Sequence, residues 1–260
     1  MNRQSAFAVA CAVSATAVLG VGASPAEAFT LQPGATIFTT PISLDKLIGT
    51  NNAFQVDDKI FHDFVFQTAC AGPGNLTCDD IVNLPPADRP VSPLFPSQVT
   101  VGPSENQINL ASGIGLFLND DWRADPGWVY DLAFGFDVHV VEDSDQYIKD
   151  AHLKIVGNDT GTISIIEDIS DPISGAVLAK LSASENKTVD WAEFEPVKKI
   201  RVLKDIQLRG TNGERAEFSI LIQEFSQTEK TPEPGTMAGL LAIGSLSIGA
   251  MLKRHFAKKA

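Results

Sequence analysis

A strict alternation of residue character runs from Trp128 to Val140 and limits the possible folds more than any other part of the sequence. Every second position in this run is large and apolar: Trp128, Tyr130, Leu132, Phe134, Phe136, Val138 and Val140. A strand places every second side chain on one face, whereas a helix would scatter these residues around its axis. The run therefore predicts a long strand with one face on a core and the other facing water or small neighbours.

Shorter strand patterns recur on both sides of this run, separated by Gly, Pro and Asn turns. They are Lys59–Gln67, Ala151–Val156, Thr162–Ile166, Val177–Leu181, Thr188–Phe194, Lys199–Leu208 and Arg215–Phe225, with shorter candidates at Ala35–Thr39 and Ser43–Leu47. Residues 69–97 are rich in proline and are expected to form a long loop. The pattern predicts an all-β chain whose residues 29–230 form a single antiparallel β-sandwich of jelly-roll-like type, with a barrel as the alternative.

Several strand details follow from the same alternation. Ala151–Val156 is expected to return beside the Trp128–Val140 strand, which would make His139 and His152 cross-strand neighbours. Lys199–Leu208 shows an offset near Lys204-Asp205 that predicts a bulge. The faces expected for two further strands are Ile60, His62, Phe64 and Phe66 together, and Ala216, Phe218, Ile220 and Ile222 opposite Glu217, Ser219, Leu221 and Gln223.

Two cysteines flank a turn-rich segment. Cys70 and Cys78 enclose the sequence AGPGNLT, and in an exported chain this spacing predicts a local disulfide. Closing such a loop is worth about 2–3 kcal/mol. A zinc site would need further Cys or His ligands at short spacing, and none lies close in the sequence.

The N-terminus has the three parts of a secretory signal peptide. Arg3 supplies the positive charge, Ala6–Val21 is apolar, and Ala26-Glu27-Ala28 fits a cleavage site. Residues 1–28 are therefore expected to be removed, leaving a mature chain that begins at Phe29. An uncleaved signal anchor is the alternative.

The C-terminal residues 231–260 also form three parts in order. Pro232-Glu233-Pro234 is followed by an uncharged apolar run, Met237–Leu252, and then by a basic end. As a helix the run would be about 24 Å long, short for a bilayer core of roughly 30 Å. Basic residues stay on the cytoplasmic side, so a membrane helix over 237–252 would leave the preceding domain outside the cytoplasm.

This tail resembles the PEP-CTERM sorting signal of bacterial surface proteins, on the residues Pro232, Glu233 and Pro234, the Gly-rich apolar run and the basic end. The resemblance implies export machinery and an exosortase as partners. It also implies an inner-membrane-anchored precursor and a final location in the periplasm, on the cell surface or in the extracellular matrix. A sortase signal would need an LPxTG-type motif, which Thr231–Gly235 lacks.

The middle of the chain is similar to cyanobacterial surface proteins with the same tail. The similar stretches are Lys59–Phe66, Trp128–Phe136, Asp150–Val156 and Lys198–Gly210. Those proteins supply no activity that could be transferred to this chain.

The net charge and the absence of known catalytic motifs reduce the number of possible functions. The formal net charge is −12, which argues against nucleic acid or anionic lipid as a partner. The sequence contains no H-E-x-x-H, G-x-S-x-G or phosphate-binding loop, and Gly113-Ile114-Gly115 is not a dinucleotide motif. We therefore expect a protein that is not an enzyme. A glycoside hydrolase that uses two carboxylates remains an alternative.

Two acidic segments and one tryptophan are the candidate binding residues. Asp120, Asp121 and Asp125 fall in a segment expected to form a turn, and Glu142, Asp143 and Asp145 fall in the next one. Loops of this kind can bind calcium, although neither has EF-hand spacing, and no other cofactor is expected. Trp122, beside Arg123, is the large aromatic expected to be exposed and is the candidate for contact with a ligand, whereas Trp128 and Tyr130 fit the core face.

These expectations lead to three alternative hypotheses for the function of the chain. The first is a non-enzymatic surface or matrix protein with a structural or interaction role. The second is a carbohydrate- or calcium-binding module within an extracellular polysaccharide matrix. The third is the carboxylate-dependent glycoside hydrolase.

Overall fold

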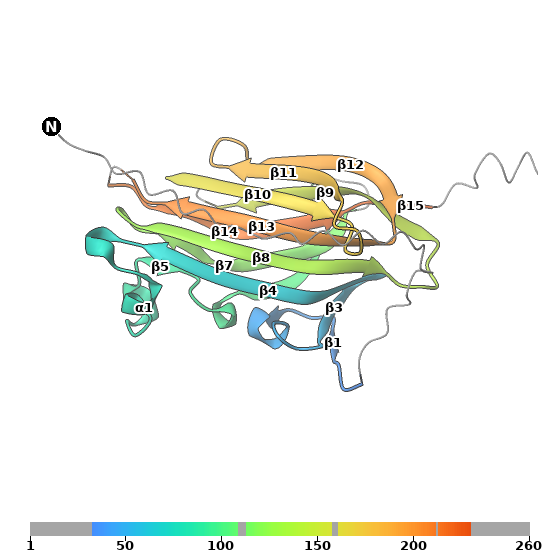
Figure 1. The fold of residues 1–260 in the computed structure, drawn as a ribbon, viewed down its shortest axis with the longest axis horizontal. Helices are drawn as coiled ribbons and strands as arrows, with labels where there is room; N and C mark the ends of the chain where they lie inside the picture. The colour runs from blue at the N-terminus through green and yellow to red at the C-terminus, as the bar shows by residue number, and fades with distance from the viewer. Residues whose placement is uncertain (1–32, 109–112, 158–160, 212, 230–260) are drawn as a thin grey trace, which may run out of the picture.

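Two β-sheets packed face to face make up the described part of the chain (Figure 1). The computed structural model describes residues 33–108, 113–157, 161–211 and 213–229. The expected signal peptide, sorting motif and membrane helix lie outside these residues. Within them, the all-β, sandwich-like fold is confirmed.

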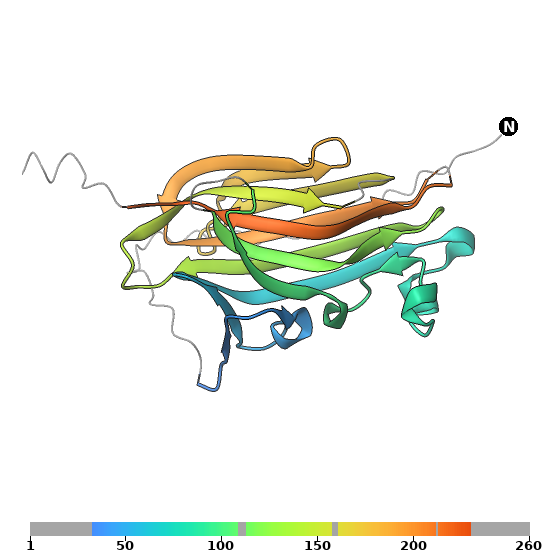
Figure 2. The same cartoon turned by 180° about the vertical axis from the view of Figure 1, so that it is seen from behind.

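We call the seven-stranded layer sheet A and the eight-stranded layer sheet B. In spatial order, sheet A contains β1 (Ile37–Phe38), β3 (Ala53–Val56), β4 (Lys59–Ala71), β8 (Val129–Val140), β13 (Lys199–Arg209), β10 (Thr162–Ser170) and β11 (Val177–Ser184). Sheet B contains β12 (Val189–Val197), β9 (Gln146–Val156), β14 (Ala216–Phe225), β7 (Ile114–Ala124), β6 (Thr100–Glu105) and β2 (Ile42–Ser43). Two short strands join sheet B, with β5 (Val91–Ser92) beside β7 and β15 (Gln227–Glu229) beside β9. Figure 2 shows the molecule from behind, where sheet B is the nearer layer and β14 is orange-red.

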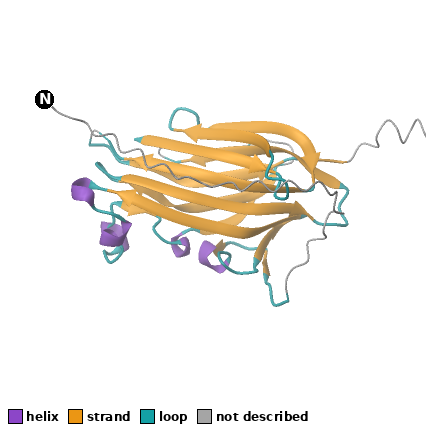
Figure 3. Ribbon diagram, in the orientation of Figure 1, coloured by secondary structure: helices purple, strands orange, loops and turns teal. Residues whose placement is uncertain are grey.

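Almost all of these strands pair in the expected direction. Only β1 and β3 run parallel among the described strand pairs, and every other pair is antiparallel. The helical segments are short: α1 (Cys78–Ile81) and the 3-10 turns η1 (Leu44–Lys46), η2 (Pro73–Asn75), η3 (Pro86–Asp88) and η4 (Pro96–Gln98). They gather along one side of the sandwich (Figure 3). No helix among the described residues is long and apolar enough to cross a membrane.

β8 lies in the middle of sheet A, and one of its faces lies on the core, as its alternation predicts. It pairs with β4 on one side and β13 on the other. Its inward residues are buried, and Phe136 packs against Phe61 and Phe64 with ring centroids 5.8 and 5.6 Å apart. Such tilted aromatic contacts add roughly 0.5–1.5 kcal/mol beyond the burial of their area.

The connection after β8 differs from the expected hairpin. β8 lies in sheet A and β9 in sheet B, so the chain crosses between the layers instead of returning alongside. His139 and His152 are therefore not cross-strand neighbours, and that prediction is wrong. His139 lies beside His62, with ring centroids 5.2 Å apart, and His152 lies opposite Trp191.

Irregular pairing in two strands changes which residues face the core. In β4 the register shifts between His62 and Val65, and Asp63 has a φ of 53°. Both Phe61 and Phe64 thereby face inward, which simple alternation would forbid.

In β14 the register shifts between Phe218 and Ile220. From Leu221 onward the inward positions are then the odd-numbered ones, so Gln223 is buried between the sheets and its predicted position on the polar face is wrong.

Strand β13 shows the opposite outcome. Its pairing with β8 and β10 continues without a shift from Lys199 to Arg209, so the predicted bulge is absent. The offset in the hydrophobic pattern arises because Lys204 occupies an inward position between Val202 and Ile206.

The expected loop over residues 69–97 is shorter than predicted, since β4 continues to Ala71 and α1 follows. The short strand expected over Ser43–Leu47 is replaced mainly by η1.

Candidate functional site

The predicted disulfide is present. Cys70 in β4 and Cys78 at the start of α1 are bonded, with their Cα atoms 5.1 Å apart. Asp80 accepts hydrogen bonds from the Thr77 amide and hydroxyl at 2.6 and 2.9 Å, which fixes the start of α1. A Cβ on Gly72 would lie 2.6 Å from the ring of Trp128, so the loop packs closely against the residue that precedes β8.

The first acidic segment does not form the expected turn. Asp120 and Asp121 belong to β7, and Asp125 follows its end. Asp121 is paired with Arg123, and Asp125 accepts a 2.6 Å hydrogen bond from Arg215. Burial raises the pKa of Asp120 to about 6, although the hydrogen bond that the Asp121 amide donates to this carboxylate opposes the shift. Asp121 and Asp125 are thus each paired with an arginine, and the three carboxylates are not gathered around one point.

The second acidic segment does lie in a turn. Glu142, Asp143 and Asp145 lie between β8 and β9. The part of the chain that the structure describes contains no group of three or more side chains arranged to hold a metal ion. Calcium binding stays a prediction.

Trp122 is not exposed, and its predicted role as a surface platform is wrong. Its side chain is fully buried and stacks on Phe218, with ring centroids 5.3 Å apart and planes 7° apart. The reason is that Asn119–Ala124 continue β7, which places Trp122 on the inward face. Trp128 and Tyr130 are buried, as predicted.

The exposed tryptophan is Trp191, which the sequence pattern did not single out. It lies on the edge strand β12 and is 58% exposed. Its ring stacks on His152, with centroids 6.0 Å apart and planes 14° apart. His152 Nε2 lies 3.0 Å from Asp150 Oδ1, and this oxygen accepts a hydrogen bond from the Ser226 amide. The contact between His152 and Asp150 therefore holds in place the imidazole ring on which Trp191 stacks.

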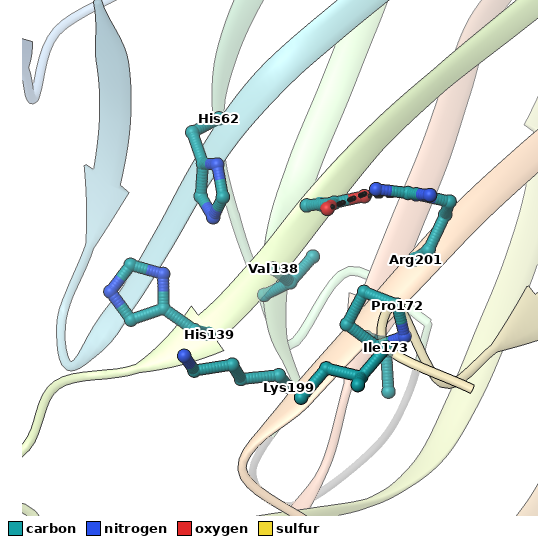
Figure 4. A pocket seen from close by; sticks show the side chains of 9 residues that line it. His62, Val138, His139, Pro172, Ile173, Lys199 and Arg201 are labelled. Atoms are coloured by element: carbon teal, nitrogen blue, oxygen red, sulfur yellow. Dashed lines mark hydrogen bonds and ion pairs between the residues drawn. The ribbon is translucent and has the colours of Figure 1, made fainter. Parts of the chain in front are cut away.

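A small pocket opens on the outer face of sheet A (Figure 4). It has a volume of about 180 Å³. Its lining comes from β4, β8 and β13 and from the turn after β10: His62, Asp137, Val138, His139, Pro172, Ile173, Lys199, Ile200 and Arg201. Arg201 binds both oxygens of Asp137, at 2.7 and 2.8 Å. The pocket is smaller than the usual 300–1,000 Å³ of a ligand cleft, so only a small polar group would fit.

The electrostatics of this pocket keep one histidine neutral. Burial, together with the nearby His62 and Lys199, lowers the pKa of His139 to about 3. The opposite charges of Asp137 and Arg201 compensate each other. The hydrogen bonds to Asp137 also raise the pKa of Arg201. The pocket can therefore hold a small ligand through hydrogen bonds.

Two adjoining hollows on another side have an acidic lining. Their volumes are about 430 and 350 Å³, and Asp57 and Glu105 line both of them. Asp57 lies in the turn between β3 and β4, and Glu105 ends β6. The hollows thus bring one carboxylate from each sheet to the same opening.

No protein-family model matches the chain, and no curated protein matches it significantly.

Proposed function

We propose that this chain is an exported protein displayed on the cell surface or in the extracellular matrix, with a structural or interaction role and no catalysis. The observation that carries the proposal is the Cys70–Cys78 disulfide. Structural disulfides form and persist in oxidising compartments and are rare in the cytosol. Such a bond fits a chain whose first and last segments read as export and sorting signals.

The proposed route uses both ends of the sequence. Export machinery removes residues 1–28, and the helix over 237–252 holds the precursor in the inner membrane with the sandwich outside the cytoplasm. An exosortase then recognises the Pro232–Pro234 motif. We also propose a jelly-roll-like topology, because the chain passes between the two sheets repeatedly, as it does after β8, β11, β12 and β13.

Deletion of Pro232–Ala260 tests the sorting role. The full-length chain should fractionate with the envelope, whereas the deletion variant should be released in soluble form. Replacement of Pro232, Glu233 and Pro234 by alanine is the matched control, since it keeps the apolar run and should trap an unprocessed precursor in the membrane. Unchanged fractionation of the deletion variant would contradict the proposal.

The second candidate function is carbohydrate binding, and the exposed Trp191 favours it. A tryptophan ring held flat by a stacked partner offers a broad apolar surface for a sugar ring, with polar groups at its edge. The matrix polysaccharide would be the partner.

A glycan array with the full chain tests this candidate. Trp191→Ala should weaken any specific binding at least about tenfold, a loss of about 1.4 kcal/mol. Val189→Ala, a partly exposed position on the same strand, should leave binding unchanged. Equal glycan binding by the wild type and Trp191→Ala would show that Trp191 is not part of a sugar-binding site.

Calcium binding and glycoside hydrolysis have weaker support. The arginine partners of Asp121 and Asp125 would compete with a calcium ion for these carboxylates. A rise in melting temperature in millimolar calcium would support calcium binding. For a hydrolase, Asp57 and Glu105 are the carboxylates to replace first, because they line a common opening.

A further inference from the structure

Three polar side chains meet in the middle of the sandwich, where the surrounding residues are apolar. They are Glu167 from β10, Lys204 from β13 and Gln223 from β14. Glu167 and Gln223 have no exposed surface, and Lys204 is 2% exposed. Since β10 and β13 belong to sheet A and β14 to sheet B, the group spans the gap between the sheets.

The strand register fixes this meeting. Glu167 lies directly opposite Lys204 in the β10–β13 pair, and both point into the core. The Lys204 ammonium contacts Glu167 Oε2 and the side-chain carbonyl oxygen of Gln223, Oε1. The amine, the carboxylate and the carboxamide are therefore held together by three separate strands.

As a non-covalent cluster this arrangement is incomplete. Within the described part of the chain, Glu167 Oε1 and Gln223 Nε2 are buried without a hydrogen-bond partner. An unsatisfied buried polar group costs about 1–3 kcal/mol, and a buried ion pair is stabilising only when its remaining polar atoms are satisfied. A reaction that removed these unsatisfied polar groups would therefore also remove their free-energy cost to the folded state.

The same burial activates the lysine. Complete burial lowers the pKa of the Lys204 amine well below its ordinary value, which favours the neutral, nucleophilic form. Among the side chains that contact this amine in the described residues, Glu167 alone can accept and return a proton.

We propose that Lys204 and Gln223 form an intramolecular isopeptide bond, with Glu167 carrying the protons. Lys204 first gives a proton to Glu167, and its Nζ then attacks the side-chain carbonyl carbon of Gln223. Glu167 passes its proton to the departing Nε2 and takes one from the attacking nitrogen. The new C–N bond forms, the old C–N bond breaks, and ammonia leaves. No oxidant, reductant or cofactor is needed.

The products fit the buried site better than the reactants. The ion pair becomes a neutral amide and a protonated Glu167, and the unsatisfied Nε2 group leaves with ammonia. The bond joins sheet A to sheet B through the core, so the two layers cannot separate when the chain unfolds. The inference does not depend on where the protein resides.

Tryptic mapping of the purified, reduced full-length chain tests the bond directly. Trypsin should fail to cut after Lys204 and should release residues 202–209 joined to residues 216–230. This branched species should be lighter than the two peptides combined by one ammonia. Separate linear peptides, with normal cleavage after Lys204, would overturn the proposal, and this result needs no variant that folds.

Variants then test the individual roles. Lys204→Met should abolish the branched species, and Glu167→Gln should leave mostly linear peptides. Lys59→Met is the matched control, because Lys59 is equally buried but its ammonium lies 3.7 Å from Asp58. It should keep the bond. A branch that joins residues 202–209 to the Glu167 peptide with loss of water would overturn the assignment to Gln223, and full branching in Glu167→Gln would overturn the proton-carrying role.

Discussion

At the scale of single residues, the sandwich places several ionisable groups where water reaches them poorly. Asp120 on β7 is one of them, and its Oδ2 is buried without a hydrogen-bond partner that the structure describes. Burial favours the protonated form, which is why its pKa rises to about 6. His139 is the basic counterpart, and its environment favours the neutral form.

Asp120→Asn should stabilise the protein at neutral pH. The folded chain holds the Asp120 proton up to about pH 6, whereas the unfolded chain releases it near 3.8, so stability falls as pH rises through this window. Because Asp120 is partly exposed, the gain at pH 7 should be on the order of 1 kcal/mol after allowance for solvent screening. Urea unfolding at pH 4 and pH 7 measures it. An equal effect at both pH values would contradict the assigned cause.

His139→Gln should make the protein less sensitive to acid. The unfolded chain protonates this histidine below about pH 6.5, but the folded chain does so only near pH 3. Wild-type stability should therefore fall as pH drops through that range, by on the order of 1 kcal/mol after screening is considered. Thermal melts from pH 7 to pH 4 check this. If the variant loses as much stability as the wild type, His139 is not the responsible group.

At the scale of elements, regular alternation could be predicted and its interruptions could not. The alternation from Trp128 to Val140, which includes all of β8, is unbroken, and its inward face is the one expected. The shifts in β4 and β14 leave no signal of their own, because an extra residue in a strand changes the facing of side chains without requiring a special residue type.

Two residues of the buried polar cluster were missed, each for its own reason. Lys204 looked like a break in the pattern because a buried lysine is rare, and Gln223 was placed outward because the shift in β14 was not visible. Trp122 was misplaced because the acidic residues around it suggested a turn, although they extend β7. The disulfide could be predicted, since its two cysteines lie close in the sequence.

Cys70→Ser should destabilise the element that joins β4 to α1. Loss of the bond frees a short loop in the unfolded chain, and the free energy of unfolding should fall by about 2–3 kcal/mol. Denaturant unfolding with and without reductant provides the control, because reductant should weaken the wild type and leave the variant unchanged. A wild type insensitive to reductant would show that the bond contributes nothing.

At the scale of the whole molecule, composition and turn spacing predicted the two-layer β architecture, but not the order of strands within each layer. That order depends on where the chain crosses between sheets, and the crossing after β8 has no local signature. The outer faces carry the features open to partners: the Trp191–His152 stack on sheet B and the small polar pocket on sheet A.

The most direct test of the central claim is to locate the native protein in its own cells and to determine its N-terminus and thiol state by mass spectrometry. The account predicts a protein outside the cytosol that begins at Phe29 and has Cys70 bonded to Cys78. A cytosolic protein that retains Met1 and has both thiols free would contradict it.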